Sequence, residues 1–292
     1  MASTLFTNAR IVDGTAPEAG APVSVLVEGG TIREVGKAVS PAKAKVVDLK
    51  GKTLMPGLID AHVHVVAGVA DLGRNAQLPD SLVTARSFVI MREMLMRGFT
   101  TVRDVGGADF GLKQATEEGH FPTPRLVISG KALSQTGGHA DFRGRYDDTA
   151  TPLTRHRLGA LGRICDGLDQ VRRAAREEMK GGADFIKIMA NGGCASPTDP
   201  IHFLGFSVSE LEAIVEEARM AGTYVSAHVY TDEAIRRCVE AGVHSLEHCN
   251  LIEAETAKLA ASRGAVAVPT LVTYDKLVID GPKLGFPPDS VA

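Results

Sequence analysis

The sequence predicts an α/β fold, a (β/α)8 TIM-like barrel preceded by a small β-sandwich portion, and three observations support this. From residue 54 onward, short apolar stretches alternate with helical patterns, which favours parallel βα units. Before residue 54 the stretches are short, alternating and interrupted by glycine. Histidines stand near the ends of several apolar stretches, where parallel barrels collect active-site residues. We therefore expect the sandwich portion over residues 1–57 and the barrel over residues 58–292.

Local signals place a hairpin and two helices. Glu28-Gly29-Gly30 joins two strand-like runs and is typical of a tight hairpin turn. Ser207-Val208-Ser209-Glu210 has capping-box spacing, and Gly222 follows as a helix stop. A second helix begins at Thr231 or Asp232 and ends at Gly242. The apolar faces of these two helices comprise Leu211, Ile214, Val215 and Ala218, then Ala234, Ile235, Cys238 and Val239.

Seven barrel strands can be counted, whereas a closed barrel needs eight. Residues 266–272 would form the seventh, and residues 273–292 are too few for a further helix and strand. Gly281-Pro282 and Phe286-Pro287-Pro288 favour a solvated connection there. The predicted strands start near Leu54, Phe99, Arg125, Ala183, Thr223, Val243 and Ala265. The sequence thus predicts a chain truncated before its eighth strand.

Composition limits the classes of function. The chain has 292 residues, of which 44% are hydrophobic and 23% charged, so it can bury a large core. With 32 basic and 35 acidic residues the net charge is −3, which argues against nucleic acid and anionic membranes as partners. No signal-like or membrane-spanning run occurs, so we expect a cytoplasmic protein. The four cysteines are far apart, which argues against disulfides, and a homo-oligomer is compatible with the sequence.

Five residues near strand ends suggest a metal site. His62 and His64 are two positions apart, so on an extended strand they project from the same face. Paired neutral imidazoles in an apolar setting usually bind metal. Lys187 lies in the middle of an apolar run, where a charged lysine is costly without a partner. His228 and His248 stand near the ends of two later strands, as a parallel barrel requires.

On these residues the chain resembles the amidohydrolase superfamily over nearly all of its length. It is similar to the branch that contains imidazolonepropionase-like hydrolases, prolidase-type dipeptidases and ochratoxin-hydrolysing amidases. The matching segments are Pro56-Gly57-Leu58-Ile59-Asp60-Ala61-His62-Val63-His64, Lys187, His228 and Glu247-His248, and the branch-level cues are Thr100-Thr101-Val102-Arg103-Asp104-Val105-Gly106-Gly107, Thr136-Gly137-Gly138-His139 and His228-Val229-Tyr230-Thr231. The resemblance also implies that strands returning from the C-terminus complete the sandwich.

The resemblance implies two divalent metal ions of the zinc type. His62 and His64 would hold one ion, and His228 and His248 the other. Lys187 would bridge them as a carbamate made with carbon dioxide, which makes it both a ligand and a catalytic residue. Burial lowers the pKa of a lysine, which favours the neutral amine that the carbamate requires.

Further candidates concern the substrate. His139 is a candidate donor to the substrate carbonyl, and Arg143 a candidate clamp for a carboxylate. Tyr230 shares a face with His228 and is a third catalytic candidate, which would bind a carbonyl or carboxylate oxygen. Asp104 is a candidate support for the metal ligands. Surface or rim positions are the alternative for Arg143 and Tyr230. The remaining histidines are expected to be surface or packing residues: His120, His156, His202 and His244.

One residue of the superfamily pattern has no counterpart. Its eighth strand carries an aspartate that binds one ion and acts as general base, and no Gly-Thr-Asp segment occurs here. Asp275, Asp280 and Asp289 lie in the tail and are poor substitutes. Three hypotheses follow: a binuclear hydrolase acting on amide or peptide bonds next to a terminal amino acid (dipeptides, or N-acyl amino acids such as ochratoxin), a ring-opening hydrolase of the imidazolonepropionase type, and an inactive fragment.

Overall fold

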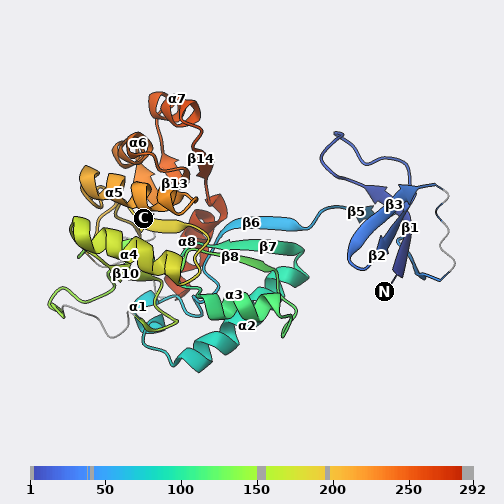
Figure 1. Ribbon diagram of the computed structural model, residues 1–292, viewed down its shortest axis with the longest axis horizontal. Helices are drawn as coiled ribbons and strands as arrows, with labels where there is room; N and C mark the ends of the chain where they lie inside the picture. The colour runs from blue at the N-terminus through green and yellow to red at the C-terminus, as the bar shows by residue number, and fades with distance from the viewer. Residues whose placement is uncertain (1–2, 38, 40–42, 150–155, 195–197, 285–292) are drawn as a thin grey trace. The chain divides into compact units, whose positions relative to one another are not determined.

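The computed structural model describes residues 3–37, 39, 43–149, 156–194 and 198–284 (Figure 1). The chain folds into two compact units, Met1–Leu58 and Ile59–Ala292. The Phe286-Pro287-Pro288 segment and Asp289, both predicted to belong to a solvated tail, lie outside the described residues.

The smaller unit contains one five-stranded sheet. Its strands are β1 (Ser3–Ile11), β2 (Val23–Glu28), β3 (Thr31–Gly36), β4 (Lys45–Asp48) and β5 (Thr53–Leu54). They are ordered β3-β2-β1-β4, and β5 also pairs with β1, so the prediction that Leu54 starts a barrel strand was wrong. The predicted hairpin is confirmed, because Glu28 pairs with Thr31 across Gly29 and Gly30 at φ 56° and 81°. A two-layer sandwich stays a prediction.

The larger unit is built on parallel strands in two sheets, ordered β6-β7-β8 and β10-β9-β11-β12-β13-β14. The predicted third strand is broken in two at Gly130, where φ is +67°. The strands are β6 (Leu58–Val63), β7 (Phe99–Asp104), β8 (Arg125–Ile128), β9 (Ala132–Ser134), β10 (Gly162–Ile164), β11 (Ile186–Met189), β12 (Val225–Thr231), β13 (Ser245–Leu251) and β14 (Val266–Val268). Within the described part, β6 and β14 are sheet edges, so a closed eight-stranded barrel stays a prediction.

Helices cover these strands. Figure 1 shows α4, α5 and α6 following one another along the six-stranded sheet, while α2 and α3 pack on β7 and β8. The helices are α1 (Leu72–Asn75), α2 (Asp80–Met96), α3 (Phe110–Glu117), α4 (Leu168–Lys180), α5 (Val208–Met220), α6 (Asp232–Ala241), α7 (Ala254–Ser262) and α8 (Leu271–Leu284). The capping box of Ser207 with Glu210 is confirmed, and all four predicted apolar residues of α5 are buried. Thr231 is the N-cap of α6, and Gly242 ends it at φ +95°.

The tail after the seventh strand differs from its prediction. Residues 266–272 were expected to be a strand, followed by a loop, but β14 ends at Val268 and α8 runs from Leu271 to Leu284. Residues 271–280 contain neither glycine nor proline, so helical hydrogen bonds can form until Gly281-Pro282 is reached. Asp280 lies in this helix near Lys276 and Lys283, away from the histidines.

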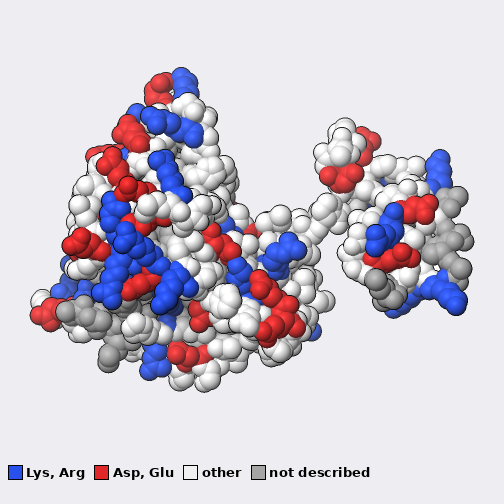
Figure 2. All heavy atoms as spheres, viewed as in Figure 1, with Lys and Arg blue, Asp and Glu red and all other residues white. Residues whose placement is uncertain are grey.

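The interior and surface are those of a globular α/β unit. One apolar core lies under α4, α5 and α6, and a second lies between α2, α3 and the three-stranded sheet. No disulfide joins any of the four cysteines, all of which are among the described residues. Basic and acidic side chains are interspersed on the face shown in Figure 2. In the described part of the chain, no helix is both long and apolar enough to cross a membrane.

Candidate metal and substrate site

The histidines predicted from strand ends lie together in one cluster. The ring centroids of His62 and His64 are 5.4 Å apart, and those of His62 and His248 are 4.8 Å apart. His228 lies 4.7 Å from His248, and His139 stacks on His228 at 4.2 Å with an interplanar angle of 17°. The cluster therefore combines residues from β6, β12, β13 and the loop after β9.

Each ring of the four strand-end histidines has one nitrogen held by a neighbouring group. Nδ1 of His62 is 2.7 Å from Glu247 Oε2, and Nδ1 of His248 is 2.7 Å from Thr270 Oγ1. His64 donates from Nδ1 to the carbonyl of Gly106, and His228 from Nε2 to the carbonyl of Gly192. A neutral imidazole that donates from one nitrogen keeps a lone pair on the other, which is the arrangement found around metal ions.

The environment keeps these imidazoles in the neutral form that binds metal. Burial lowers the pKa of His64 to about 3, and neighbouring His62 adds to the effect. Burial likewise lowers the pKa of His62, His228 and His248. Protons therefore do not compete with a cation for their lone pairs at neutral pH.

Lys187 is buried on β11, with 1% of its surface exposed. Burial lowers the pKa of its ammonium to about 8, although the Glu247 carboxylate opposes the shift. Among the described residues, none forms a hydrogen bond or ion pair with its Nζ. The amine is thus the least satisfied charged group beside the histidines, as expected for a group whose partner is a ligand or a modification.

The strand that carries His248 has an irregular end. His248 and Cys249 have φ values of +78° and +55°, and the pairing of β12 with β13 shifts register between Val229 and Thr231. Positive φ is uncommon for residues other than glycine and is concentrated at functional sites. The bulge re-aims the His248 side chain toward the ring of His62 rather than continuing the strand alternation.

Asp104 supports the backbone beside the histidines. Its buried carboxylate accepts hydrogen bonds from the backbone N–H of Val65 at 2.7 Å and from those of Gly106 and Ala108. Burial raises the pKa of Asp104 to about 7, and these three donors act against the rise. Because the carbonyl of Gly106 in turn accepts the hydrogen bond of His64, Asp104 positions the His64 ring through the main chain. Asp104 therefore contacts the backbone beside the histidines rather than a histidine ring.

His139 is held from the opposite side by a loop. Its Nδ1 lies 2.8 Å from Asp199 Oδ2, and the backbone N–H of Gly193 donates to the same carboxylate. Gly193 permits this approach, since a Cβ at that position would overlap the His139 ring. Asn191 fixes the loop to the end of β12. Its Nδ2 donates to the loop carbonyls of Ile201 and Phe203, and its Oδ1 accepts from the backbone N–H groups of Tyr230 and Thr231.

The other substrate candidates have different surroundings. Tyr230 is buried and lies 5.0 Å from His248 and 4.7 Å from His228, measured between ring centroids. Tyr274 of α8 approaches Tyr230 at 6.0 Å. Arg143 instead forms a bidentate ion pair with Asp141 and donates to the carbonyl of Thr149.

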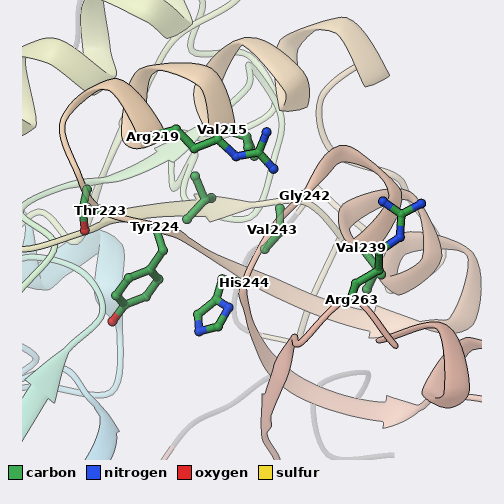
Figure 3. Close-up of a pocket in the computed structure, with 10 residues that line it drawn as sticks. Val215, Arg219, Thr223, Tyr224, Val239, Gly242, Val243, His244 and Arg263 are labelled. Carbon is green, nitrogen blue, oxygen red and sulfur yellow. The ribbon is translucent and has the colours of Figure 1, made fainter. Parts of the chain in front are cut away.

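The remaining histidines lie apart from the cluster. His120 pairs with Glu118, while His156, His202 and His244 are exposed. His244 lines a cavity of about 370 Å³ with Tyr224, Arg219 and Arg263 (Figure 3). Tyr224 and His244 directly precede β12 and β13, whereas His228 and His248 lie further along these strands. The cavity is therefore at the amino ends of the strands, away from the candidate site.

The cluster offers imidazole donors in pairs rather than in groups of three. Among the described residues, no three His, Cys, Asp or Glu side chains are close enough to hold one ion. The arrangement predicted from the sequence instead uses two histidines for each ion and Lys187 between them, so histidine pairs are the relevant feature. Buried neutral imidazoles with one nitrogen anchored are the form in which histidine binds zinc-type ions.

Sequence reasoning assigned no role to four residues of this region: Arg103, Asp199, Glu247 and Tyr274. Arg103 and Glu247 occur there only within the quoted segments. The roles of Arg103 and Glu247 could have been found, because each is a charged residue within a predicted barrel strand, where it needs a partner. Asp199 and Tyr274 carry no such signal. The first lies in a loop, and the second lies in the segment predicted to be a loop.

Comparisons with known proteins agree with this geometry. A sequence model of the amidohydrolase family matches residues 53–283. An ochratoxinase of Aspergillus niger is 36% identical over 231 residues, covering 74% of this chain and 47% of that protein. Two crystal structures each match 99% of this chain and 71% of the matched protein's chain. One is of an amidohydrolase, with 55% identity and a TM-score of 0.94. The other is of a prolidase complexed with N-methylphosphonate-L-proline, with 49% identity and a TM-score of 0.95. The chain thus spans about half the length of the ochratoxinase, and these relatives confirm the predicted branch.

Proposed function

Because the chain belongs to the amidohydrolase family, we propose that it forms most of a binuclear metal-dependent hydrolase that cleaves an amide or peptide bond next to a terminal amino acid. One observation carries the proposal. Neutral imidazoles from separate parallel strands gather beside a buried lysine, each with one nitrogen anchored. Parallel barrels assemble their active sites at strand ends in this way.

The proposed ligands are the five strand residues. His62 and His64 would hold one ion and His228 and His248 the other, with Lys187, as a carbamate, as a shared ligand. When bound, two zinc-type ions supply an acidified water and polarise the scissile carbonyl. The buried Lys187 amine supports carbamylation, because its lowered pKa favours the neutral form that reacts with carbon dioxide. Electron density on Nζ, or a carbamate carbon signal from protein equilibrated with ¹³C-bicarbonate, tests this; a bare amine in metal-loaded protein would contradict it.

The substrate contacts are assigned to His139, Tyr230 and Arg143. Tyr230 donates its hydroxyl proton to a substrate oxygen, since burial raises its pKa and keeps it protonated. His139 lies against His228 and is oriented by Asp199, which suits it to contact the scissile carbonyl. Arg143 would bind a substrate carboxylate only by sharing its existing pair with Asp141. We therefore place it at the rim of the site.

The proposed substrates are dipeptides and N-acyl amino acids. Similarity to an ochratoxinase and to a prolidase that binds N-methylphosphonate-L-proline supports amides that carry a free carboxylate beside the scissile bond. A panel of free acids and their methyl esters tests this class. We expect the acids to be cleaved faster, and equal rates on both would remove the basis for carboxylate recognition.

The complete protein is proposed to close the strands into a (β/α)8 barrel and to supply a carboxylate general base. This is supported by the edge strands β6 and β14 and by the 71% coverage of the matched structures. Residues 1–292 alone should then bind metal weakly and hydrolyse little, since general base catalysis typically contributes about 10²–10⁴-fold. The activity of residues 1–292 should be compared with that of a form extended by about one βα unit and further strands. Equal activity of both forms would place the base within the sequence shown.

A further inference from the structure

A buried network of charged and hydroxyl side chains lies directly beneath His62. At its centre is Glu247 of β13, with no exposed surface. Its Oε1 accepts hydrogen bonds from Arg103, Ser226 and Ser245, each at 2.7 Å. Its Oε2 accepts from Nδ1 of His62 at 2.7 Å. Burial alone would raise the pKa of Glu247, but the hydrogen bond from His62 and the nearby cations hold it below its ordinary value.

Arg103 of β7 connects this carboxylate to the neighbouring strands. Its Nε donates to the carbonyl of Ala61 at 2.7 Å, which is the residue directly before His62 on β6. Its Nη1 donates to the Tyr224 hydroxyl at 3.2 Å and to Ser245 at 3.1 Å. The rigid planar fork of arginine suits such contacts in several directions. One side chain therefore joins β6 and β13, the two strands that carry His62 and His248.

The hydrogen bond to Glu247 fixes which nitrogen of His62 carries the ring proton. A carboxylate only accepts hydrogen bonds, so the bond between Glu247 and His62 places the ring proton on Nδ1. The lone pair is then on Nε2, and the ring cannot rotate without leaving the buried carboxylate short of a donor. Arg103 meanwhile holds the main chain one residue away. Ring and backbone are thus constrained by the same ion pair.

We propose that Arg103 and Glu247 are a positioning pair for the metal site, which sets the tautomer and orientation of His62 and holds β6 against β13. This inference rests on the proposed function, because it assigns the pair a role toward the ion that His62 would bind. Neither residue is proposed to touch substrate or metal. Groups of this kind, one contact behind the ligands, typically change metal affinity or activity by about 10–100-fold when altered.

A similar ion pair elsewhere in the larger unit provides a matched control. Arg163 of β10 is 8% exposed and pairs with Glu177 and Glu178 of α4 at 2.6 Å and 3.0 Å. Both partners lie on a helix that contributes no side chain to the histidine cluster. Removing either arginine takes a cation away from its carboxylate partners and should lower the thermal stability. Only the loss of Arg103 should change the metal site.

The first experiment reads the tautomer in metal-free protein, so it does not depend on metal binding. Long-range ¹H–¹⁵N correlation spectra of the chain distinguish Nδ1–H from Nε2–H imidazoles, and His62→Ala assigns the His62 signals. We expect a single Nδ1–H form in the wild type and a mixture in Glu247→Gln, because an amide can either accept or donate. An unchanged single tautomer in Glu247→Gln would overturn the positioning role.

The second experiment measures the zinc affinity of the complete protein by competition with a chromogenic chelator. We expect about 10–100-fold weaker binding in Glu247→Gln and Arg103→Met, and no change in Arg163→Met. If the two residues act as a unit, the double variant Arg103→Met/Glu247→Gln should bind zinc no more weakly than whichever single variant has the lower zinc affinity. Glu247→Gln keeps the side-chain volume and serves if Arg103→Met does not fold.

The outcomes separate the two proposals. If the complete wild-type protein binds no zinc, the proposed function fails, and the tautomer measurement alone decides the positioning role. If the wild type binds zinc and Glu247→Gln binds it equally well, the positioning inference fails while the metal site stands. Equal weakening in Arg163→Met would show a general loss of packing and would also overturn the inference.

Discussion

In the candidate site, His62 and His139 are each anchored by a carboxylate, which lies on a strand for His62 and in a loop for His139. His62 on β6 reaches Glu247 on β13 at 2.7 Å, and His139 after β9 reaches Asp199 in the loop before α5 at 2.8 Å. Glu247 also accepts from three side chains on parallel strands, whereas Asp199 also accepts from the backbone of its own loop. We call the strand histidines with Lys187 and Glu247 the strand-borne half of the site, and His139 with Asp199 and Gly193 the loop-borne half. The strand-borne half is held by neighbouring strands, whereas the loop-borne half depends on the close approach at Gly193.

Because of this difference, the two halves should control different properties, namely metal content and turnover. The strand-borne half should determine metal content, since its groups include all of the proposed ligands; one ligand anchor, the carbonyl of Gly192 that holds His228, belongs instead to the loop that carries Gly193. The loop-borne half should determine turnover of metal-loaded protein, because active-site loops contact substrate while the scaffold stays fixed. Variants of the two halves should then separate in metal content and in kcat.

The largest effect is expected from His62→Ala combined with His64→Ala. This change removes both ligands of one proposed ion, so metal content should fall by about one ion per chain and hydrolysis by the complete protein should drop below detection. Elemental analysis after gel filtration, beside an assay, measures both. A full metal complement in the double variant would break the assignment of the strand-borne half.

Gly193→Ala tests the loop-borne half. The new methyl group would overlap the His139 ring and must displace it, and a shift of about 1 Å at a reacting group can cost about 10²-fold in rate. We expect kcat/KM of the complete enzyme to fall by about that factor while metal content is unchanged. Gly144→Ala is the control, because no atom lies within 4 Å of a Cβ there. Loss of metal in Gly193→Ala would show that the two halves are not separate.

Asp199→Asn should have a smaller effect of the same kind. The amide keeps the size of the side chain but no longer fixes the His139 proton on Nδ1, and removal of such an orienting group typically costs about 10–100-fold. We expect the loss in kcat rather than in KM or metal content. Steady-state kinetics with elemental analysis measure all three, and a change confined to KM would assign His139 to binding alone.

The same contrast explains how much could be predicted from sequence. Strand ends in a parallel sheet meet at one edge, so His62, His64, Lys187, His228 and His248 could be placed together from spacing and periodicity alone. The capping box of α5 was predictable because both of its partners lie within four residues. These features depend on local geometry and a repeated pattern.

Contacts between distant segments could not be predicted. The pair of His139 with Asp199 joins positions 60 residues apart through an irregular loop, which has no periodicity to interpret. Helix α8 was misread because Gly281-Pro282 suggested a loop, although the ten residues before it lack helix breakers. The split of the third strand at Gly130 arises from tertiary contacts, since Glu178 of α4 fills the space where a side chain would lie.

The smallest effect is expected from Ser207→Ala, at the point where the loop-borne half ends and α5 begins. Ser207 accepts a hydrogen bond from the backbone N–H of Glu210, while its own N–H donates to the Glu210 side chain. Losing this cap should lower the free energy of unfolding by about 1 kcal/mol, and Glu212→Ala on an exposed face of the same helix is the control.

Metal content and kcat should stay unchanged in Ser207→Ala, because α5 contributes no side chain to the histidine cluster. Chemical denaturation and steady-state kinetics of the same preparation measure both properties. If kcat instead falls as far as in Asp199→Asn, then the start of α5 and the loop before it move as one element. The loop-borne half would in that case extend into the helix, and its boundary would lie beyond Gly193 and Asp199.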